Sequence, residues 1–287
     1  MTASIDRGVS SWTPAYATSL LAEQLTGVRR LGVAFSGGVD SAVLLALSLR
    51  VLGPDQVVAL LGVSPSLAAS EREQAHDVAA QIGAALVEVV TDEQARPAYE
   101  ANGPDRCFHC KDELFTRIDS EIVGHYRLDA VAYGENADDR LRPDRPGSKA
   151  AELHTVLSPL AAAGMTKADV RAVATALELS VANKPAAPCL ASRIPHHQVV
   201  TPVKLGQIER AESALRALGF TDFRVRHHDE VARVELAPAD LVRAVSNPIR
   251  EQLVLGVRAA GFRFVALDLA GIQSGAFTLP LVTRDHD

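Results

Sequence analysis

Short apolar runs alternate with helical patterns through the first half of this chain, and that alternation limits the folds open to it. Each apolar run has the length and composition of a buried strand, and each is separated from the next by a segment with helical spacing. Such an order predicts a parallel sheet covered by helices on both faces, a doubly wound α/β domain. The expected strands are residues 30–35, 56–63, 84–90 and 128–134, and the expected helices are residues 41–52, 70–83, 112–123 and 166–179.

A different pattern begins beyond a proline-rich stretch near residue 190. Two adjacent strand patterns and a later third one lie among helical segments, which predicts a small C-terminal α+β domain. The expected elements are helix 204–218, strands 223–228 and 231–236, helix 248–260 and strand 262–269. We therefore expect an N-terminal segment (1–28), an α/β domain (29–185), an active-site loop and junction (186–203) and a C-terminal α+β domain (204–287).

Composition narrows the classes of function. The net charge of −6 provides no footprint for a nucleic-acid backbone, so nucleic acid is disfavoured as a partner. No run approaches the roughly 18 to 20 apolar residues that cross a bilayer, and the first residues lack an apolar signal core. We expect a cytoplasmic protein without a membrane partner. Three cysteines, Cys107, Cys110 and Cys189, are too few and odd in number for a disulfide framework.

A glycine-rich hexapeptide joins the first expected strand to the first expected helix. Its two glycines let backbone N–H groups approach an anion, and the helix N-terminus adds a favourable field for phosphate. The lysine of the GxxxxGK[ST] phosphate loop is missing, so this is a different nucleotide loop. The expected nucleotide-binding residues are Ser36, Gly37, Gly38, Val39, Asp40 and Ser41, where Asp40 orients the loop or holds Mg²⁺. The simpler alternative is a Gly-Gly turn with a serine cap.

Three further segments carry residue types that suit chemistry. The first, RCFHCK (106–111), precedes an expected helix, and the second, YGENADD (133–139), follows an expected strand. The third, PCLASRIP (188–195), lies in the proline-rich junction. With them stand SPLAAAGMTKADVR (158–171) and RVRHHDEVARVE (224–235).

These motifs carry a resemblance to known proteins. The SGGVDS hexapeptide resembles the signature of the PP-loop ATP pyrophosphatase superfamily, which has an adenine nucleotide alpha-hydrolase-like fold. All segments together, over about residues 15–275, resemble the ATP-dependent sulfur transferases called LarE. That family supplies sulfur for the biosynthesis of the nickel-pincer nucleotide. The resemblance implies that ATP and Mg²⁺ are used to adenylylate a carboxylate of pyridinium-3,5-biscarboxylic acid mononucleotide, releasing pyrophosphate.

The resemblance also implies roles for particular side chains. A thiolate of Cys189 would displace AMP from the activated carboxylate. Phosphate-binding roles fall to Ser192, Arg193, Arg224 and Arg226, the last two of which share one face of an expected strand; a solvated face is the alternative. Asn136 and Asp138 would contact nucleotide or Mg²⁺, or form an Asx-type turn.

The two extra cysteines bear on the source of sulfur. If Cys189 gave up its own sulfur, the protein would be spent after one turnover. Members with three cysteines are expected instead to hold a [4Fe–4S] cluster on Cys107, Cys110 and Cys189, with one iron open to bind a sulfide. A zinc site completed by His109 or His197 is the alternative. The expected partners are the pyridinium mononucleotide, a sulfide or persulfide donor and further copies of the chain.

Rival functions share parts of this pattern. A tRNA thiolation enzyme also pairs a PP-loop with a CxxC and a third cysteine, but the acidic charge disfavours it. An ammonia-using synthetase would share SGGVDS without a need for three placed cysteines. A nucleotide-binding sensor without turnover is the alternative outside the enzymes.

Overall fold

The computed structural model describes residues 12–141 and 146–273 and divides into two compact units. Each unit is assembled from segments that are separated in the sequence. Unit 1 comprises Met1–Val63, Ser70–Thr91 and Lys111–Ala187, and unit 2 comprises Ser64–Ala69, Asp92–Cys110 and Pro188–Asp287.

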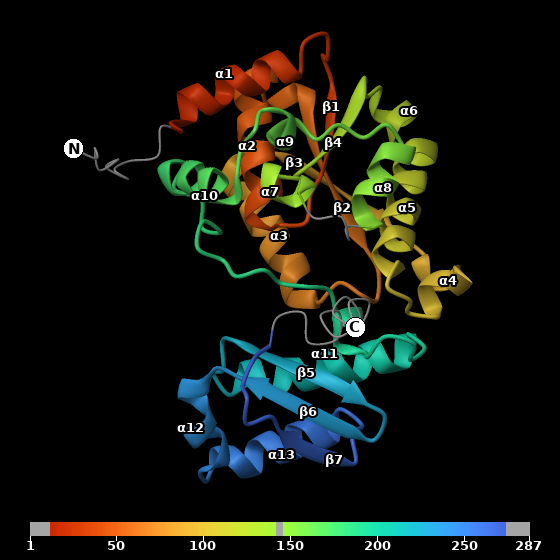
Figure 1. Cartoon of the computed structure of the whole chain (residues 1–287), viewed down its shortest axis with the longest axis vertical. Helices are drawn as coiled ribbons and strands as arrows, with labels where there is room; N and C mark the ends of the chain where they lie inside the picture. Colours follow the sequence, from red (N-terminus) through yellow and green to blue (C-terminus); the bar gives the residue numbers. More distant parts are fainter. Residues whose placement is uncertain (1–11, 142–145, 274–287) are drawn as a thin grey trace, which may run out of the picture. The chain divides into compact units, whose positions relative to one another are not determined.

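Unit 1 is built on a four-stranded parallel sheet with the spatial order β3-β2-β1-β4 (Figure 1). The central strand β1 and its neighbour β2 are apolar and largely buried, as expected for a sheet covered on both faces. The chain reverses its direction of progress across the sheet at β1. Open α/β sheets bind ligands at such a switch point. The strands are β1 (Leu31–Ala34), β2 (Val57–Val63), β3 (Ala85–Val90) and β4 (Ala130–Tyr133).

Helices cover both faces of this sheet, which confirms the predicted fold class. Helix α2 packs on β1 and β2, while α1 and α10 pack on α2 (Figure 1). The connection from β3 to β4 contains α5, which lies across the sheet from α2 (Figure 1) and places Leu114 against Gly62 of β2. The helices are α1 (Pro14–Gln24), α2 (Val39–Leu52), α3 (Ala69–Ile82), α5 (Arg106–Arg117), α6 (Val123–Tyr126), α7 (Ala137–Arg140), α8 (Pro146–Leu153), α9 (Pro159–Ala162) and α10 (Lys167–Ala176).

Several helices differ from the sequence prediction. The helix expected at 112–123 begins six residues earlier, at Arg106, and continues after Arg117 through a π-helical turn, Ile118–Ile122. The CxxC motif therefore lies inside the helix and not before it. Helix α1 falls within the segment expected to precede the domain, where Thr13 caps it and Pro14 occupies its first turn.

Unit 2 contains a three-stranded sheet of order β5-β6-β7, which confirms the predicted small α+β domain. Strands β5 (Phe223–His228) and β6 (Val231–Leu236) are antiparallel, and β7 (Phe264–Leu267) joins β6 in parallel. Apolar side chains of α11 and α13 pack on one face of the sheet and bury residues such as Phe220 and Val257. The helices are α4 (Pro97–Glu100), α11 (Pro202–Ala217), α12 (Leu241–Val245) and α13 (Ile249–Ala259).

The described part of the chain contains no helix that is both long and apolar enough to span a bilayer. The first residues of the expected N-terminal segment and the end of the expected C-terminal domain lie outside the described residues.

Candidate functional site

The nucleotide loop follows β1 and runs directly into α2. Gly37 has a φ of +68°, and a Cβ on it would lie 3.0 Å from Ala75, so a side chain is disfavoured on both counts. The Ser41 hydroxyl donates to the Gly38 carbonyl at 3.0 Å and accepts the Ser36 N–H at 3.3 Å. The serines thus hold the loop closed on itself. Helix α2 begins at Val39, two residues earlier than expected, so its first N–H groups belong to the loop.

Asp40 is the centre of a polar cluster at this end of the sheet. Its Oδ2 accepts from Lys167 Nζ at 2.5 Å, and its Oδ1 accepts from Asn136 Nδ2 at 3.1 Å. Lys167 stands at the start of α10, and its backbone N–H donates to Asp138 at 2.8 Å. Strand ends that are far apart in sequence are thereby joined around the nucleotide loop. Of the two roles considered for Asp40, these contacts support orientation of the loop.

Asn136 and Asp138, which follow β4, were expected either to contact nucleotide or to form an Asx-type turn, and Asn136 has features of both. Asn136 caps α7 in a capping box with Asp139, which is the turn alternative. The same Asn136 side chain contacts Asp40, so the turn also reaches the nucleotide loop. Gly134 fits this approach because a Cβ there would lie 2.6 Å from the Ser41 nitrogen. The end of β4 therefore packs directly on the loop.

Lys167 is the functional candidate that the sequence prediction missed. A signal was present, because Thr166 and Asp169 form a capping box that fixes Lys167 at a helix start. What the sequence did not provide was the pairing of Lys167 with Asp40, 127 positions away. The lysine places a positive charge beside a loop suited to phosphate, where the GxxxxGK[ST] lysine is missing.

All three cysteines belong to unit 2, and they lie within electrostatic reach of one another. Cys189 is exposed at the start of a short 3₁₀ turn, and its carbonyl accepts from the Ser192 hydroxyl at 2.7 Å. Cys107 is also exposed, whereas Cys110 packs against an apolar cluster that includes Tyr99 and Leu190. We call these three cysteines the thiol site. Cys107 and Cys110 come from α5, and Cys189 comes from the proline-rich junction.

Arg106 is the cation of the thiol site. Its buried guanidinium donates to the Ala191 carbonyl at 2.9 Å and to the Asn102 side chain, and so joins α5 to the junction loop. Burial alone lowers the pKa of Arg106, but the thiolates of Cys189 and Cys107 raise that pKa by more, and the net change is upward. A permanent positive charge therefore faces two exposed sulfurs.

Cys110 differs from the other two thiols. Burial raises the pKa of the Cys110 thiol well above its usual value, and the carboxylate of Glu93 and the thiolate of Cys189 raise it further. Burial likewise raises the pKa of Tyr99, whose hydroxyl lies 2.5 Å from the Ser66 hydroxyl in the same cluster. This side of the thiol site is apolar and favours uncharged groups.

The three thiols lie near few other side chains that could bind a metal ion with them. Among residues 12–141 and 146–273, no group of three or more His, Cys, Asp or Glu side chains is arranged to hold a metal ion. His109, the zinc ligand considered for completing the set, lies 3.1 Å from Asp105, and His197 is exposed. As the side chains stand, they do not fit an iron–sulfur cluster or a zinc ion.

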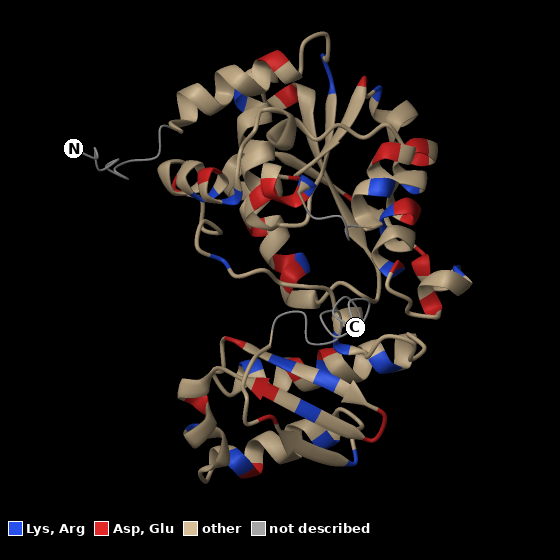
Figure 2. Cartoon of the chain, viewed as in Figure 1, with Lys and Arg blue, Asp and Glu red and all other residues tan. Residues whose placement is uncertain are grey.

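The expected phosphate-binding arginines lie on β5 and in the junction loop, and Figure 2 colours the basic positions along β5 and β6 blue. Arg193 and Arg226 are buried and paired, Arg193 with Glu212 at 2.9 Å and Arg226 with Glu235 at 2.9 Å. Arg226 also donates to the Ser192 carbonyl at 3.0 Å, so the two arginines fix the loop that carries Cys189.

Arg224 lies on β5 among both acidic and basic groups, and it donates to the Phe223 carbonyl at 2.7 Å. It lies 3.5 Å from Asp222, and burial together with the positive charge of Arg193 lowers its pKa. A cation that is partly desolvated beside other cations gains from an incoming anion. The phosphate-binding role expected for Arg224 stays a prediction, and the lowered pKa is consistent with it.

Comparison with known proteins gives this geometry a family. A model of the asparagine synthase family matches residues 19–130, which include the nucleotide loop. The pyridinium-3,5-bisthiocarboxylic acid mononucleotide synthase of Lactiplantibacillus plantarum is 34% identical over 265 residues, covering 92% of this chain and 94% of that protein. The chain belongs to the LarE family.

Two further relatives also align with most of this LarE protein and over most of their own length. An uncharacterised protein of Synechocystis is 41% identical over 246 residues, 85% of this chain and 90% of its own. Another from Methanocaldococcus jannaschii is 27% identical over 241 residues, 84% of this chain and 90% of its own. Membership of the family makes the chain a PP-loop enzyme that uses ATP, as the resemblance implied.

Proposed function

We propose that this LarE protein is an ATP-dependent sulfur transferase that converts a carboxylate of pyridinium-3,5-biscarboxylic acid mononucleotide to a thiocarboxylate for nickel-pincer nucleotide synthesis. The observation that carries the proposal is the gathering of three thiols around Arg106 in a chain that also holds a PP-loop. The name of the Lactiplantibacillus plantarum relative, a bisthiocarboxylic acid mononucleotide synthase, supports this acceptor. An ammonia-using synthetase has no use for such thiols.

The first step of the proposal is activation of the acceptor. A carboxylate is a poor electrophile until one of its oxygens becomes a leaving group. An acceptor carboxylate oxygen attacks the α-phosphorus of ATP, the bond to the β-phosphate oxygen breaks, and pyrophosphate leaves. The loop N–H groups and Lys167 stabilise the departing pyrophosphate, while Asp40 and Asn136 hold the loop in place; Mg²⁺, when bound beside the loop, would neutralise the phosphates.

The second step of the proposal transfers sulfur. The Cys189 sulfur attacks the carbonyl carbon of the acyl adenylate, and AMP leaves with the former carboxylate oxygen. Cys189 suits this role because its side chain is exposed in a loop that Arg193 and Arg226 hold rigidly. In the sacrificial route the Cβ–S bond then breaks, the Cα proton is lost, and dehydroalanine remains at position 189. Arg224 binds the phosphate of the acceptor.

The [4Fe–4S] cluster predicted on Cys107, Cys110 and Cys189 stays a prediction. The electrostatic coupling of the three thiols supports it, although no three candidate ligands in the described part of the chain are arranged to hold a metal. Anaerobic purification followed by assays of iron and acid-labile sulfide measures it directly. About four irons and four or five sulfides per chain would support the cluster, and an iron-free enzyme that turns over repeatedly would refute it.

The remaining parts of the proposal concern the chain as a whole. We assign nucleotide binding to residues 29–185. We assign sulfur transfer to the thiol in the 186–203 loop, together with the strand of residues 204–287 that binds the acceptor phosphate. A cytoplasmic location, assembly with further copies and a sulfide or persulfide donor belong to the same proposal.

Mass spectrometry after turnover tests this function. The protein is mixed with ATP, Mg²⁺ and the biscarboxylic acid mononucleotide, and both product and protein are weighed. A product 16 Da heavier for each oxygen replaced by sulfur is expected from the atomic masses, as about 32 replaces about 16. Loss of H₂S from Cys189 would identify the sacrificial route, and an intact chain with thiolated product would identify an external sulfur source. Amide formation with ammonia, or no product, would contradict the proposal.

A further inference from the structure

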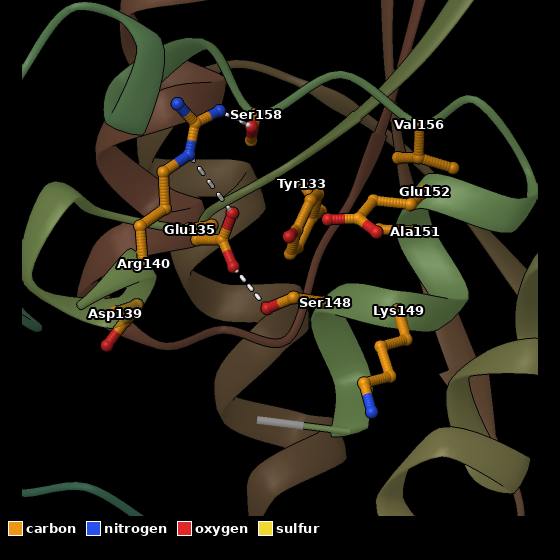
Figure 3. Close-up of a pocket in the computed structure, with 10 residues that line it drawn as sticks. All are labelled: Tyr133, Glu135, Asp139, Arg140, Ser148, Lys149, Ala151, Glu152, Val156 and Ser158. Carbon is orange, nitrogen blue, oxygen red and sulfur yellow. Dashed lines mark hydrogen bonds and ion pairs between the residues drawn. The ribbon is translucent and has the colours of Figure 1, made fainter. Parts of the chain in front are cut away.

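Every sulfur nucleophile of this chain lies in unit 2, in the segments Asp92–Cys110 and Pro188–Asp287. Unit 1 has a cavity of about 450 Å³ beside the end of β4, but its lining side chains in the described structure are hydroxyls, carboxylates, cations and apolar groups (Figure 3). The buried carboxylate there, Glu135, is compensated, since it accepts from Ser148 and lies 3.7 Å from Arg140. Exchange between thiols therefore takes place within unit 2 alone.

Two contacts hold the loop that carries Cys189 against the start of α5. Arg106 precedes Cys107 in α5, and its guanidinium donates at 2.9 Å to the carbonyl of Ala191. Ala191 lies two residues after Cys189 in the junction loop. One turn further along α5, Cys110 packs against the apolar cluster that contains the residue directly after Cys189. The first turn of α5, with Cys107 in it, is thereby fixed beside Cys189.

Access to solvent distinguishes the three thiols. Cys107 and Cys189 are exposed, so a small reagent reaches both of these sulfurs. Cys110 is half-buried and faces the apolar cluster. Thiol exchange requires that the attacking sulfur can approach the sulfur that it attacks, so its rate depends on access. Cys107 and Cys189 are therefore the pair best suited to exchange with each other.

The guanidinium of Arg106 serves both exposed sulfurs. Its charge interacts with those of Cys189 and Cys107, and its contacts with the backbone of the junction loop fix it in place. In thiol exchange, negative charge passes from the attacking sulfur to the leaving sulfur. A positioned cation beside both sulfurs stabilises that charge throughout the exchange.

We propose that Cys107 is the resolving thiol for a persulfide carried by Cys189. The persulfide forms when an alkyl persulfide passes its outer sulfur to Cys189 and leaves as a thiol. The Cys107 sulfur then attacks the inner sulfur, which belongs to Cys189, and the S–S bond of the persulfide breaks. The outer sulfur departs as hydrosulfide and takes up the proton of Cys107. A Cys107–Cys189 disulfide remains, and a dithiol reduces it to restore both thiols.

The inference rests on the proposed function for the use of this sulfur. When the outer sulfur has been acylated by the activated acceptor, the same attack by Cys107 releases thiocarboxylate in place of hydrosulfide. The transferred sulfur then comes from the donor, and the Cβ–S bond of Cys189 stays intact. In the described part of the chain no three candidate ligands are arranged to hold a metal, whereas this exchange needs only two sulfurs at a time.

Sulfide release from the full chain, without ATP or acceptor, tests the inference. The reduced protein is desalted without oxygen and mixed with cysteine persulfide; sulfide is measured, and the alkylated peptides are mapped by mass spectrometry. The wild-type protein should release about one sulfide per chain above the background set by Cys189→Ser, and should contain a Cys107–Cys189 disulfide.

Two variants identify the resolving thiol. Cys107→Ser should release sulfide at least about tenfold more slowly and keep its persulfide on Cys189, because a thiol from solution must replace a neighbouring one. Cys110→Ala should still form the Cys107–Cys189 disulfide, since the half-buried thiol takes no part in the exchange.

Several outcomes would overturn the inference. These are a Cys189 persulfide that persists in the wild-type protein without sulfide release, equal release rates in wild type and Cys107→Ser, or a disulfide that joins Cys110 to either of the other two cysteines. Failure of the proposed function appears separately, as an absence of thiolated product with ATP and acceptor in a protein that still forms the Cys107–Cys189 disulfide.

Discussion

Replacement of Lys167 by methionine tests the nucleotide site most sharply. Lys167 is the charged partner of Asp40 and the cation placed beside the loop in the described structure. Methionine keeps most of the side-chain length but removes the charge. We expect ATP-dependent pyrophosphate release to fall, because the charge that forms on the departing pyrophosphate loses a positioned cation.

The magnitude follows from the exposure of the pair. Loss of one buried donor from a developing charge costs about 3 to 4 kcal/mol. The Lys167 side chain is 39% exposed and that of Asp40 is 22% exposed, so solvent screens the interaction. We therefore expect a loss of about 2 kcal/mol in transition-state stabilisation, or about 30-fold in kcat/KM for ATP. The fold itself should lose less than about 1 kcal/mol, since exposed ion pairs contribute little.

The assay couples pyrophosphate release to a colorimetric readout, with a thermal melt on the same samples. Arg29→Met is the matched control, because it breaks an exposed ion pair with Asp129 in the same unit, at the start of β1 and not at its end. The control should leave kcat/KM within twofold. A Lys167→Met protein with wild-type kcat/KM would refute the reasoning, as would a loss in Tm large enough to explain the lost activity.

Three further predictions follow from individual contacts. Gly134→Ala should weaken ATP binding at least tenfold in calorimetry, because its Cβ would lie 2.6 Å from the Ser41 nitrogen, and normal affinity would contradict the packing described. Glu212→Gln should lower the free energy of unfolding by about 3 kcal/mol in urea titrations, since it leaves the buried Arg193 without its counter-charge; a change below about 1 kcal/mol would argue against this. Two aspartates raise the pKa of His154 despite the opposing effect of burial, so its contribution to stability is full below its unfolded pKa and is lost as pH rises through the folded value. The stability difference between wild type and His154→Gln should accordingly shrink as the pH rises above about 6.5, the usual unfolded pKa of histidine, and a difference that grows with pH would contradict the sign.

Local sequence patterns predicted much of the fold. Strands β5 and β6 have the predicted bounds, 223–228 and 231–236, because their alternation is regular and each is bounded by turn residues. The helix expected at 166–179 is present as α10, with Thr166 and Asp169 in a capping box at its start. The doubly wound sheet was predicted from the order of the apolar runs. Each run can be recognised from the residues of its own segment.

Long-range contacts were beyond that reasoning. The pairing of Asp40 with Lys167 joins two helix starts that nothing in either segment connects. Arg193 was expected to bind phosphate, but the structure gives it a buried carboxylate partner, Glu212, from a helix that carries no motif. Arg106, expected only as part of a motif, turned out to be the buried cation of the thiol site.

The early start of α5 has a similar origin. Residues 106–111 were expected to precede a helix. In the structure the buried Arg106 anchors the first turn through Asn102 and Ala191, so tertiary contacts decide where the helix begins. Local propensity alone does not contain that contact.

The central claim, that ATP activates an acceptor carboxylate through its α-phosphate, is tested most directly by oxygen transfer. The biscarboxylic acid mononucleotide is labelled with ¹⁸O in its carboxylates, mixed with ATP and Mg²⁺, and the released AMP is weighed. The account predicts one ¹⁸O atom in each AMP formed, because the attacking carboxylate oxygen leaves with the phosphate. AMP that carries only unlabelled oxygen, or formation of ADP and phosphate in its place, would contradict it.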